Sequence, residues 1–207
     1  MPTWTRLKEQ VKDQGIKVVN VLGGLAPDSD QPMPIDMQHQ IQRHWYRINE
    51  LLGTKFNFDF WLNNEPRRST YPACRAVLAA RTLDQKHGLS ESFLNNASLE
   101  ELMIEAIQKA YYLRAMNPSD NSVLMLIFDE LALSLGLPSD CISEYLSILR
   151  DHSTHRVLLE EIEFGRSLTS SGFPSLVFQT ESKYYAVPLD YKNAQTMLDH
   201  IHACTAL

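Results

Sequence analysis

The sequence predicts an α/β fold in which a small sheet is interrupted by a helical insertion. Strand-like segments occur near both ends, at residues 16–22 and 174–190, whereas the region between them carries helical periodicity. A lone strand near the N-terminus has to pair with the strands near the C-terminus, because an unpaired strand leaves its backbone groups without partners. We therefore expect a discontinuous sheet domain, residues 1–34 and 153–207, with an inserted helical domain, residues 35–152.

The N-terminal region combines a short helix with a strand. Apolar residues recur at spacings of three and four from Trp4 to Val11, which predicts an amphipathic helix over residues 4–14. The following segment, "IKVVNVLGG", is a nearly continuous apolar run that ends in two glycines. This pattern is typical of a buried strand, which we expect over Ile16–Leu22.

Helices dominate the middle of the chain. Apolar residues repeat by three or four from Met37 to Leu52, which predicts a helix over Ile35–Leu52 that ends at Gly53. The aromatic residues of "KFNFDFWLNNEP" alternate as in a strand, but asparagines and a proline follow at once, so we expect a loop there. Further helices are predicted over residues 71–82, 98–116, 120–135, 140–150 and 154–168.

Two of these helices have clear end signals. Ser98, with Glu101 three residues later, matches a capping box, in which each side chain bonds to the backbone N–H of the other residue. Gly136 followed by Pro138 marks a helix end, since glycine adopts the left-handed conformation there and proline cannot continue a helix.

The C-terminal region predicts a hairpin and a final helix. The segments "PSLVFQT" and "YYAVPLD" are rich in β-branched and aromatic residues, and three polar residues separate them. A last helix is expected from Asn193 to about Cys204. Pro174 stands where the glycine-led turn of "SGFPSLVF" becomes a strand. Proline is normally confined to sheet edges or to the first residue of a strand, because it donates no backbone hydrogen bond.

Composition excludes several classes of protein. The chain of 207 residues carries a net charge of -6, so nucleic-acid backbones and anionic membrane surfaces should repel it, and we expect neither as a partner. No run approaches the roughly 20 apolar residues of a membrane-spanning helix. The first residues, "MPTWTRLKEQ", lack the apolar core of a secretory signal, so we expect a cytoplasmic protein.

Motifs for metal, phosphate and serine chemistry are absent from the sequence. The histidines include the close pair His152 and His155, but no carboxylate or thiol completes a ligand spacing, and exposed polar residues near a helix start are the better interpretation. The segment "VLGGLAP" lacks the spacing and the lysine of a phosphate-binding loop, and no G-x-S-x-G turn occurs. We therefore expect no metal and no other cofactor.

The three cysteines, Cys74, Cys141 and Cys204, are odd in number and far apart, as expected in a reducing compartment. Cys74 is the candidate reactive thiol, because the helix start and Arg75 beside it could stabilise a thiolate. A packed thiol that faces the core is the alternative, since free cysteine is among the most buried residue types. Asp140 disfavours a thiolate at Cys141, and Cys204 is nearly terminal.

Several segments together resemble one family. They are "GGLAPD" (residues 23–28), "STYPACRAV" (69–77), "IQKAYYLRAMNPSD" (107–120) and "GFPSLV" (172–177). In this order and spacing they resemble the DsbA-like thioredoxin-fold family, in its cytosolic branch of protein-disulfide-isomerase-like and FrnE-like proteins. The resemblance covers essentially the whole chain, and it implies a thioredoxin-like sheet with an inserted α-helical domain.

The resemblance also implies thiol-disulfide exchange and a substrate-binding loop at the proline. In the family, a low-pKa cysteine of a Cys-x-x-Cys motif at a helix N-terminus attacks a substrate disulfide, and a cis-proline faces this dithiol. A cis bond before Pro174 would leave the backbone groups of Phe173 and Ser175 open to pair with an extended substrate. We therefore expect Phe173, Pro174 and Ser175 to bind substrate.

The catalytic dithiol of the family is absent from this sequence. No Cys-x-x-Cys occurs, and "MPTWTRLKEQV" resembles the remainder of the helix that follows the dithiol in relatives. Thr169 stands where relatives often have a glycine. We expect a truncated gene, or a start codon assigned too far downstream, rather than an evolved loss, because everything after the gap keeps the family pattern.

Loss of the first strand has a structural cost. In a thioredoxin-type sheet this strand lies between the one expected at Ile16–Leu22 and the one that follows Pro174. Its absence would leave unpaired backbone groups on both flanks, each costing roughly 1 to 3 kcal/mol if buried without water. Three outcomes are open: the two strands close up, another chain supplies a strand, or an upstream segment of the natural protein does.

Three functions are open on these observations. The first is a DsbA-like thiol-disulfide oxidoreductase or isomerase, inactive in dithiol exchange as the chain stands, whose partner is a protein or peptide thiol or disulfide. The second is a non-catalytic peptide-binding or adaptor module. The third and weaker is a glutathione-dependent isomerase or transferase, since related folds with the same insertion bind glutathione through a cis-proline loop. An oligomer is compatible with each.

Overall fold

The chain forms two compact units. The computed structural model describes residues 2–26, 29–92, 94, 97–168, 172–181 and 183–205. Contacts divide it into one unit of Met1–Gly23 with Leu159–Leu207 and a second unit of Gly24–Leu158. The sequence places domain boundaries after residues 34 and 152, and the assignment of domains stays a prediction.

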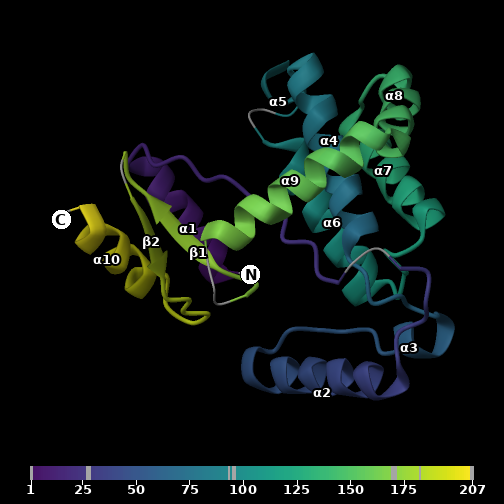
Figure 1. The fold of residues 1–207 in the computed structure, drawn as a ribbon, viewed down its shortest axis with the longest axis horizontal. Helices are drawn as coiled ribbons and strands as arrows, with labels where there is room; N and C mark the ends of the chain where they lie inside the picture. The colour runs from purple at the N-terminus through teal and green to yellow at the C-terminus, as the bar shows by residue number, and fades with distance from the viewer. Residues whose placement is uncertain are drawn as a thin grey trace. The chain divides into compact units, whose positions relative to one another are not determined.

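The first unit is a β-hairpin packed against helices (Figure 1). Its strands run antiparallel, with Leu176 opposite Val187 and Gln179 opposite Tyr184, which confirms the predicted hairpin. The elements of this unit are α1 (Pro2–Asp13), the second half of α9 (His152–Leu168), β1 (Leu176–Gln179), β2 (Tyr184–Val187) and α10 (Ala194–Thr205).

One apolar cluster holds this unit together. Leu176 and Phe178 of β1 pack against a buried core to which the helices α1 and α10 contribute. A two-stranded hairpin is marginally stable in water, so it needs such a partner. Each fully buried side chain of this kind contributes about 1.5–3 kcal/mol. The core consists of Leu7 and Val11 of α1, Val187 of β2, and Ala194, Met197, Leu198 and Ile201 of α10.

Residues 16–22 do not form the predicted strand, so that prediction is wrong. Ile16 and Val18 pack against the same cluster as β1, but Val19 is 67% exposed and the segment has no regular secondary structure. Within the described residues no backbone hydrogen bond links this segment to β1. The Leu22 N–H instead donates to Glu161 Oε1 at 2.7 Å. An apolar run becomes a strand only beside a partner that completes its ladder.

The second unit is helical. Its packing centres on α4, which lies against α6 and α8, and Tyr145 of α8 donates from its hydroxyl to the Ala76 carbonyl of α4 at 3.1 Å. None of the helices that the structure describes is long and apolar enough to cross a membrane. The elements are α2 (Ile35–Leu52), α3 (Phe60–Asn63), α4 (Tyr71–His87), α5 (Leu89–Ser92), α6 (Leu99–Leu113), α7 (Asn121–Leu135), α8 (Ser139–Arg150) and the first turns of α9.

The predicted helices are confirmed, with shifts at their ends. α2 has the predicted bounds, whereas α4 continues to His87 and the one-turn helices α3 and α5 were not predicted. The Ser98 hydroxyl accepts from the Glu101 N–H at 3.5 Å, which is one half of the expected capping box. Gly136 ends α7 with φ 67°, the left-handed conformation that glycine adopts without strain.

The aromatic segment after α2 is a loop up to Asp59, as predicted, whereas the residues that follow form the one-turn helix α3. The segment packs around one tryptophan. Trp45 of α2 is buried. Its ring centroid lies 5.0 Å from that of Phe56, 5.8 Å from that of Phe58 and 6.0 Å from that of Phe60. Tyr111 of α6 adds a fourth ring at 5.2 Å. The alternation of these aromatic residues therefore reflects shared packing on Trp45 rather than a strand.

Leu124→Ala should destabilise the helical unit, whereas Leu133→Ala should not. Both residues lie on α7, but Leu124 is 0% exposed and Leu133 is 83% exposed, so only the first substitution leaves a cavity. We expect the free energy of unfolding to fall by about 2–5 kcal/mol for Leu124→Ala and by less than about 0.5 kcal/mol for Leu133→Ala. Urea unfolding measures both, and equal losses would contradict this packing of α7.

Candidate functional site

The proline loop, residues 172–175, leads into β1. Its Phe173–Pro174 peptide bond is cis, and Gly172 adopts φ 79°. The Ser175 hydroxyl donates to the Gly172 carbonyl, which closes the loop on itself. Several predicted landmarks lie outside the described residues, namely Thr169, Ser171, and Pro27 and Asp28 of the glycine turn.

Phe173 is seated where Gly23 leaves room for its ring. A Cβ atom added to Gly23 would lie 2.7 Å from the ring, closer than real Cβ atoms approach. A Cβ atom added to Gly165 of α9 would lie 3.2 Å from Val21 but at an ordinary contact distance, 3.9 Å, from the Phe173 ring. Phe173 stays 39% exposed. The lack of a side chain at Gly23 therefore allows this position of the loop.

An apolar pocket of about 260 Å³ lies beside the proline loop, within the same unit. Trp4 of α1 and Met197 of α10 form part of its wall, and Pro174 and Leu176 connect it to the start of β1. Leu189 adds a further apolar side chain. Pockets for whole small molecules are larger, about 300–1,000 Å³, so this one suits a single apolar side chain.

Asp190 is the charged residue that lines this pocket. Its carboxylate accepts the backbone N–H groups of Lys192 at 2.8 Å and of Asn193 at 2.9 Å. These hydrogen bonds hold the pKa of Asp190 below its usual range, because they favour the ionised form. The carboxylate is therefore committed to the turn before α10, and it shapes the pocket rather than supplying an acid or a base.

β1 is open along one edge. It pairs with β2 on one side, and no described residue pairs with its backbone on the other. The unpaired N–H and C=O groups of an edge strand can form a ladder with an extended chain. The pocket lies at the first residue of this strand, Leu176. The loop, the pocket and the open edge can therefore contact one extended peptide.

None of the three cysteines lines the pocket beside the proline loop. Cys74 is half-buried in the first turn of α4, in the helical unit. Cys141 is buried, and burial raises the pKa of its thiol, with smaller contributions from Glu144 and Asp140. Cys204 lies on α10. All three are free cysteines.

Sequence reasoning identified the loop but missed the residues that complete the pocket. Trp4, Leu189, Tyr191 and Met197 are distant from Pro174 along the chain, and only tertiary packing brings them together. Apolar residues of this kind occur throughout the sequence, so no local signal distinguishes them. Two of the lining residues are joined by a hydrogen bond: the Thr3 hydroxyl donates to the Tyr191 carbonyl at 2.8 Å.

Comparison with known proteins bears on the fold. No protein-family model and no curated protein matches the chain. A solved structure of a "putative protein disulfide isomerase" from Nitrosomonas europaea matches with a TM-score of 0.71 at 18% identity, covering 99% of this chain and 90% of that one. The cytosolic disulfide reductase DsbM from Pseudomonas aeruginosa matches with a TM-score of 0.66 at 20% identity, covering 99% and 95%.

The chain has the DsbA-like thioredoxin fold. A further solved structure, DsbM with GSH, matches with a TM-score of 0.65 at 20% identity, over 99% of this chain and 95% of that one. Sequence identities of 18–20% support a shared fold and nothing further. The predicted fold class is confirmed, and the two-stranded sheet with its long helical segment is compatible with an insertion and a missing strand.

Gly23→Ala should perturb the proline loop of this DsbA-like fold through the Phe173 ring. Gly23 has no positive φ, so the backbone tolerates alanine and the added methyl group acts only through its contact. We expect a loss of about 1–3 kcal/mol in the free energy of unfolding, as for other overpacked sites. The same substitution in a Phe173→Ala background should be nearly neutral.

Chemical unfolding of the four proteins in this double-mutant cycle gives the coupling energy. A loss that is the same in both backgrounds would show that Phe173 does not lie against Gly23.

Proposed function

We propose that this chain binds extended segments of thiol- or disulfide-containing proteins along β1 and does not itself exchange disulfides. The observation that supports this most is the open edge of β1, with an apolar pocket at its first residue. The neighbouring structures described as a disulfide isomerase and a disulfide reductase support a cysteine-containing protein as the partner. The description of DsbM as cytosolic supports the cytosol as the compartment.

Recognition would combine two contributions. Backbone groups of β1 pair with the backbone of the bound segment, each hydrogen bond contributing a net 0.5–1.5 kcal/mol or so irrespective of sequence. The pocket takes one apolar side chain, and full burial of such a side chain is worth about 1.5–3 kcal/mol. The pocket next to Pro174 therefore discriminates between peptides, while the strand edge supplies affinity common to all of them.

The absence of exchange follows from the thiols. Exchange needs an attacking thiolate, and release of the mixed disulfide needs a second thiol close by. The sequence has three cysteines and no Cys-x-x-Cys. Cys141 is unsuited to attack, because burial raises the pKa of its thiol. Cys74 stays the candidate reactive thiol, and the sequence has no Cys-x-x-Cys motif whose second thiol could resolve a mixed disulfide.

Leu189→Asp should weaken peptide binding. Leu189 is 37% exposed and lines the pocket, so the substitution places a charge where an apolar side chain binds. With fluorescein-labelled, S-carboxymethylated insulin B chain as the probe, fluorescence anisotropy should show a dissociation constant about tenfold higher or more. Leu159→Asp is the matched control, since Leu159 is 43% exposed in the same unit but does not line the pocket. Equal affinities for both variants would refute the site.

Insulin reduction in the presence of dithiothreitol should proceed at the uncatalysed rate with this chain, and Cys74→Ser should leave the rate unchanged. Rapid turnover of either kind would overturn the non-catalytic proposal. Turnover that Cys74→Ser abolishes would make Cys74 the attacking thiol, and turnover that survives Cys74→Ser would mean that another thiol of the chain acts.

Glutathione binding is a second candidate function, favoured by the matching structure of DsbM with GSH. Glutathione is a short peptide with a cysteine, so the loop that receives an extended segment could also receive it. Isothermal titration calorimetry with reduced glutathione tests this. A heat of binding that Leu189→Asp abolishes would support the proline loop as the glutathione site. If millimolar glutathione gives no heat of binding, glutathione binding is ruled out as a function.

A further inference from the structure

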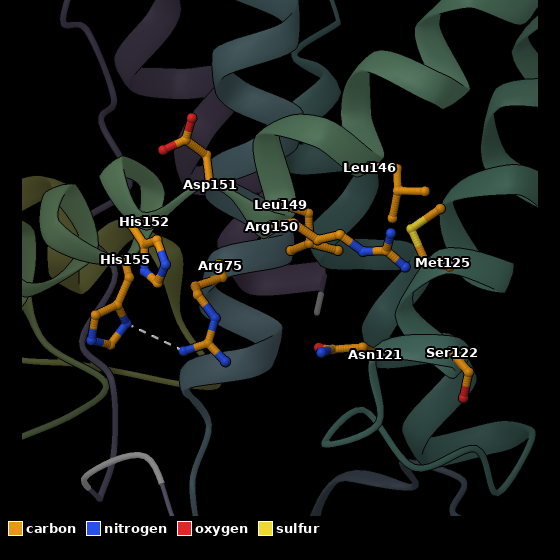
Figure 2. A pocket seen from close by; sticks show the side chains of 10 residues that line it. All are labelled: Arg75, Asn121, Ser122, Met125, Leu146, Leu149, Arg150, Asp151, His152 and His155. Atoms are coloured by element: carbon orange, nitrogen blue, oxygen red, sulfur yellow. Dashed lines mark hydrogen bonds between the residues drawn. The ribbon is translucent and has the colours of Figure 1, made fainter.

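A second cavity, of about 560 Å³, lies wholly within the helical unit (Figure 2). Four basic side chains line it: Arg75, Arg150, His152 and His155. Asp151 is the acidic residue among the lining residues. The lining therefore has an excess of positive charge, although the chain as a whole is acidic.

Asp151 offsets only part of this charge. Its carboxylate accepts the Ser153 N–H at 2.7 Å at the start of α9. Hydrogen bonds from Ser153 are the main cause that holds the pKa of Asp151 below its usual range, with a smaller contribution from His152. In Figure 2 the carboxylate points away from Arg75 and Asn121. Two arginines therefore line the cavity against one carboxylate that is bound at the helix start.

The start of α7 reinforces the positive charge. Asn121, the first residue of α7, lines the cavity. The start of α9 lies there too, but its Ser153 N–H is bound to Asp151. Helix N-termini carry partial positive charge and unpaired N–H groups, both of which favour anions. α8 presents its C-terminus to the same cavity, but that end carries Arg150, whose cation offsets the opposite dipole.

Arg75 contacts His155 at one side of the cavity. Arg75 Nη1 lies 3.4 Å from His155 Nδ1 (Figure 2). A guanidinium can only donate, so His155 Nδ1 is the acceptor in this contact. The guanidinium groups of Arg75 and Arg150 and the Asn121 amide line the same cavity.

We infer that this cavity binds the oxyanion of a small organic molecule, a phosphate or a carboxylate. Forked guanidinium donors match such oxygens. The remaining wall, formed by Met125, Leu146 and Leu149, is apolar and contacts the organic part of the ligand. The volume lies in the range of pockets for small molecules, about 300–1,000 Å³. The inference does not rest on the proposed peptide function, whose residues belong to the other unit.

Titration of the ¹⁵N-labelled full chain with phenyl phosphate, with benzoate and with inorganic phosphate tests the inference. We expect phenyl phosphate or benzoate to shift the amide signals of Asn121, Ser122 and Ser153. Stronger binding of phenyl phosphate than of benzoate assigns a phosphate ligand, and the reverse assigns a carboxylate. Weaker binding of inorganic phosphate than of phenyl phosphate would show that the apolar wall contributes.

Arg150→Gln should weaken the binding of the better probe about tenfold, because it removes one charged donor. Arg150 is exposed, so the fold should survive, as far-ultraviolet circular dichroism can verify. Arg47→Gln is the matched control: it removes the same charge from an exposed position on α2 that does not line the cavity. No binding at millimolar probe, shifts confined to other regions, or equal weakening by both variants would overturn the inference.

Discussion

Burial of one face of the hairpin against α1 and α10 is the interaction on which the hairpin unit depends. Two strands cannot hold themselves together in water, so the apolar cluster that includes Leu7, Val187 and Ile201 supplies the stability that a larger sheet would provide. The same helices form the walls of the pocket beside Pro174, through Trp4 and Met197. Stability and the shape of the candidate peptide site therefore have one physical origin.

Close packing contributes to the placement of the proline loop. Phe173 lies against Gly23 and Gly165, two residues far apart in the sequence that share only the lack of a side chain. Close-packed interiors respond to a single added methyl group. The position of the loop at the start of β1 is therefore set jointly by the segment before the helical unit and by α9.

The sequence predicts elements whose cause is local and fails where the cause is a distant partner. The periodicity of α2 and the hairpin of β1 and β2 depend on neighbouring residues, and both are as predicted. Residues 16–22 are apolar like a buried strand, but they do not form one. A strand needs a second strand to pair with, and an apolar run does not show whether that partner is present. From the sequence, His155 is expected to be an exposed polar residue. Its contact with Arg75 could not be predicted, because the two residues lie 80 positions apart.

The charge of the chain determines which anions the basic cavity can accept. There are 25 acidic residues against 19 lysines and arginines, so the surface as a whole repels anions. Such repulsion is screened beyond about 8 Å at physiological salt, whereas contacts inside a cavity are screened much less. A long polyanion would have to cross the acidic surface, and most of its charges would lie outside the cavity. A small anion would place its charge directly beside Arg75 and Arg150, so the same charge distribution that disfavours a long polyanion permits a compact ligand.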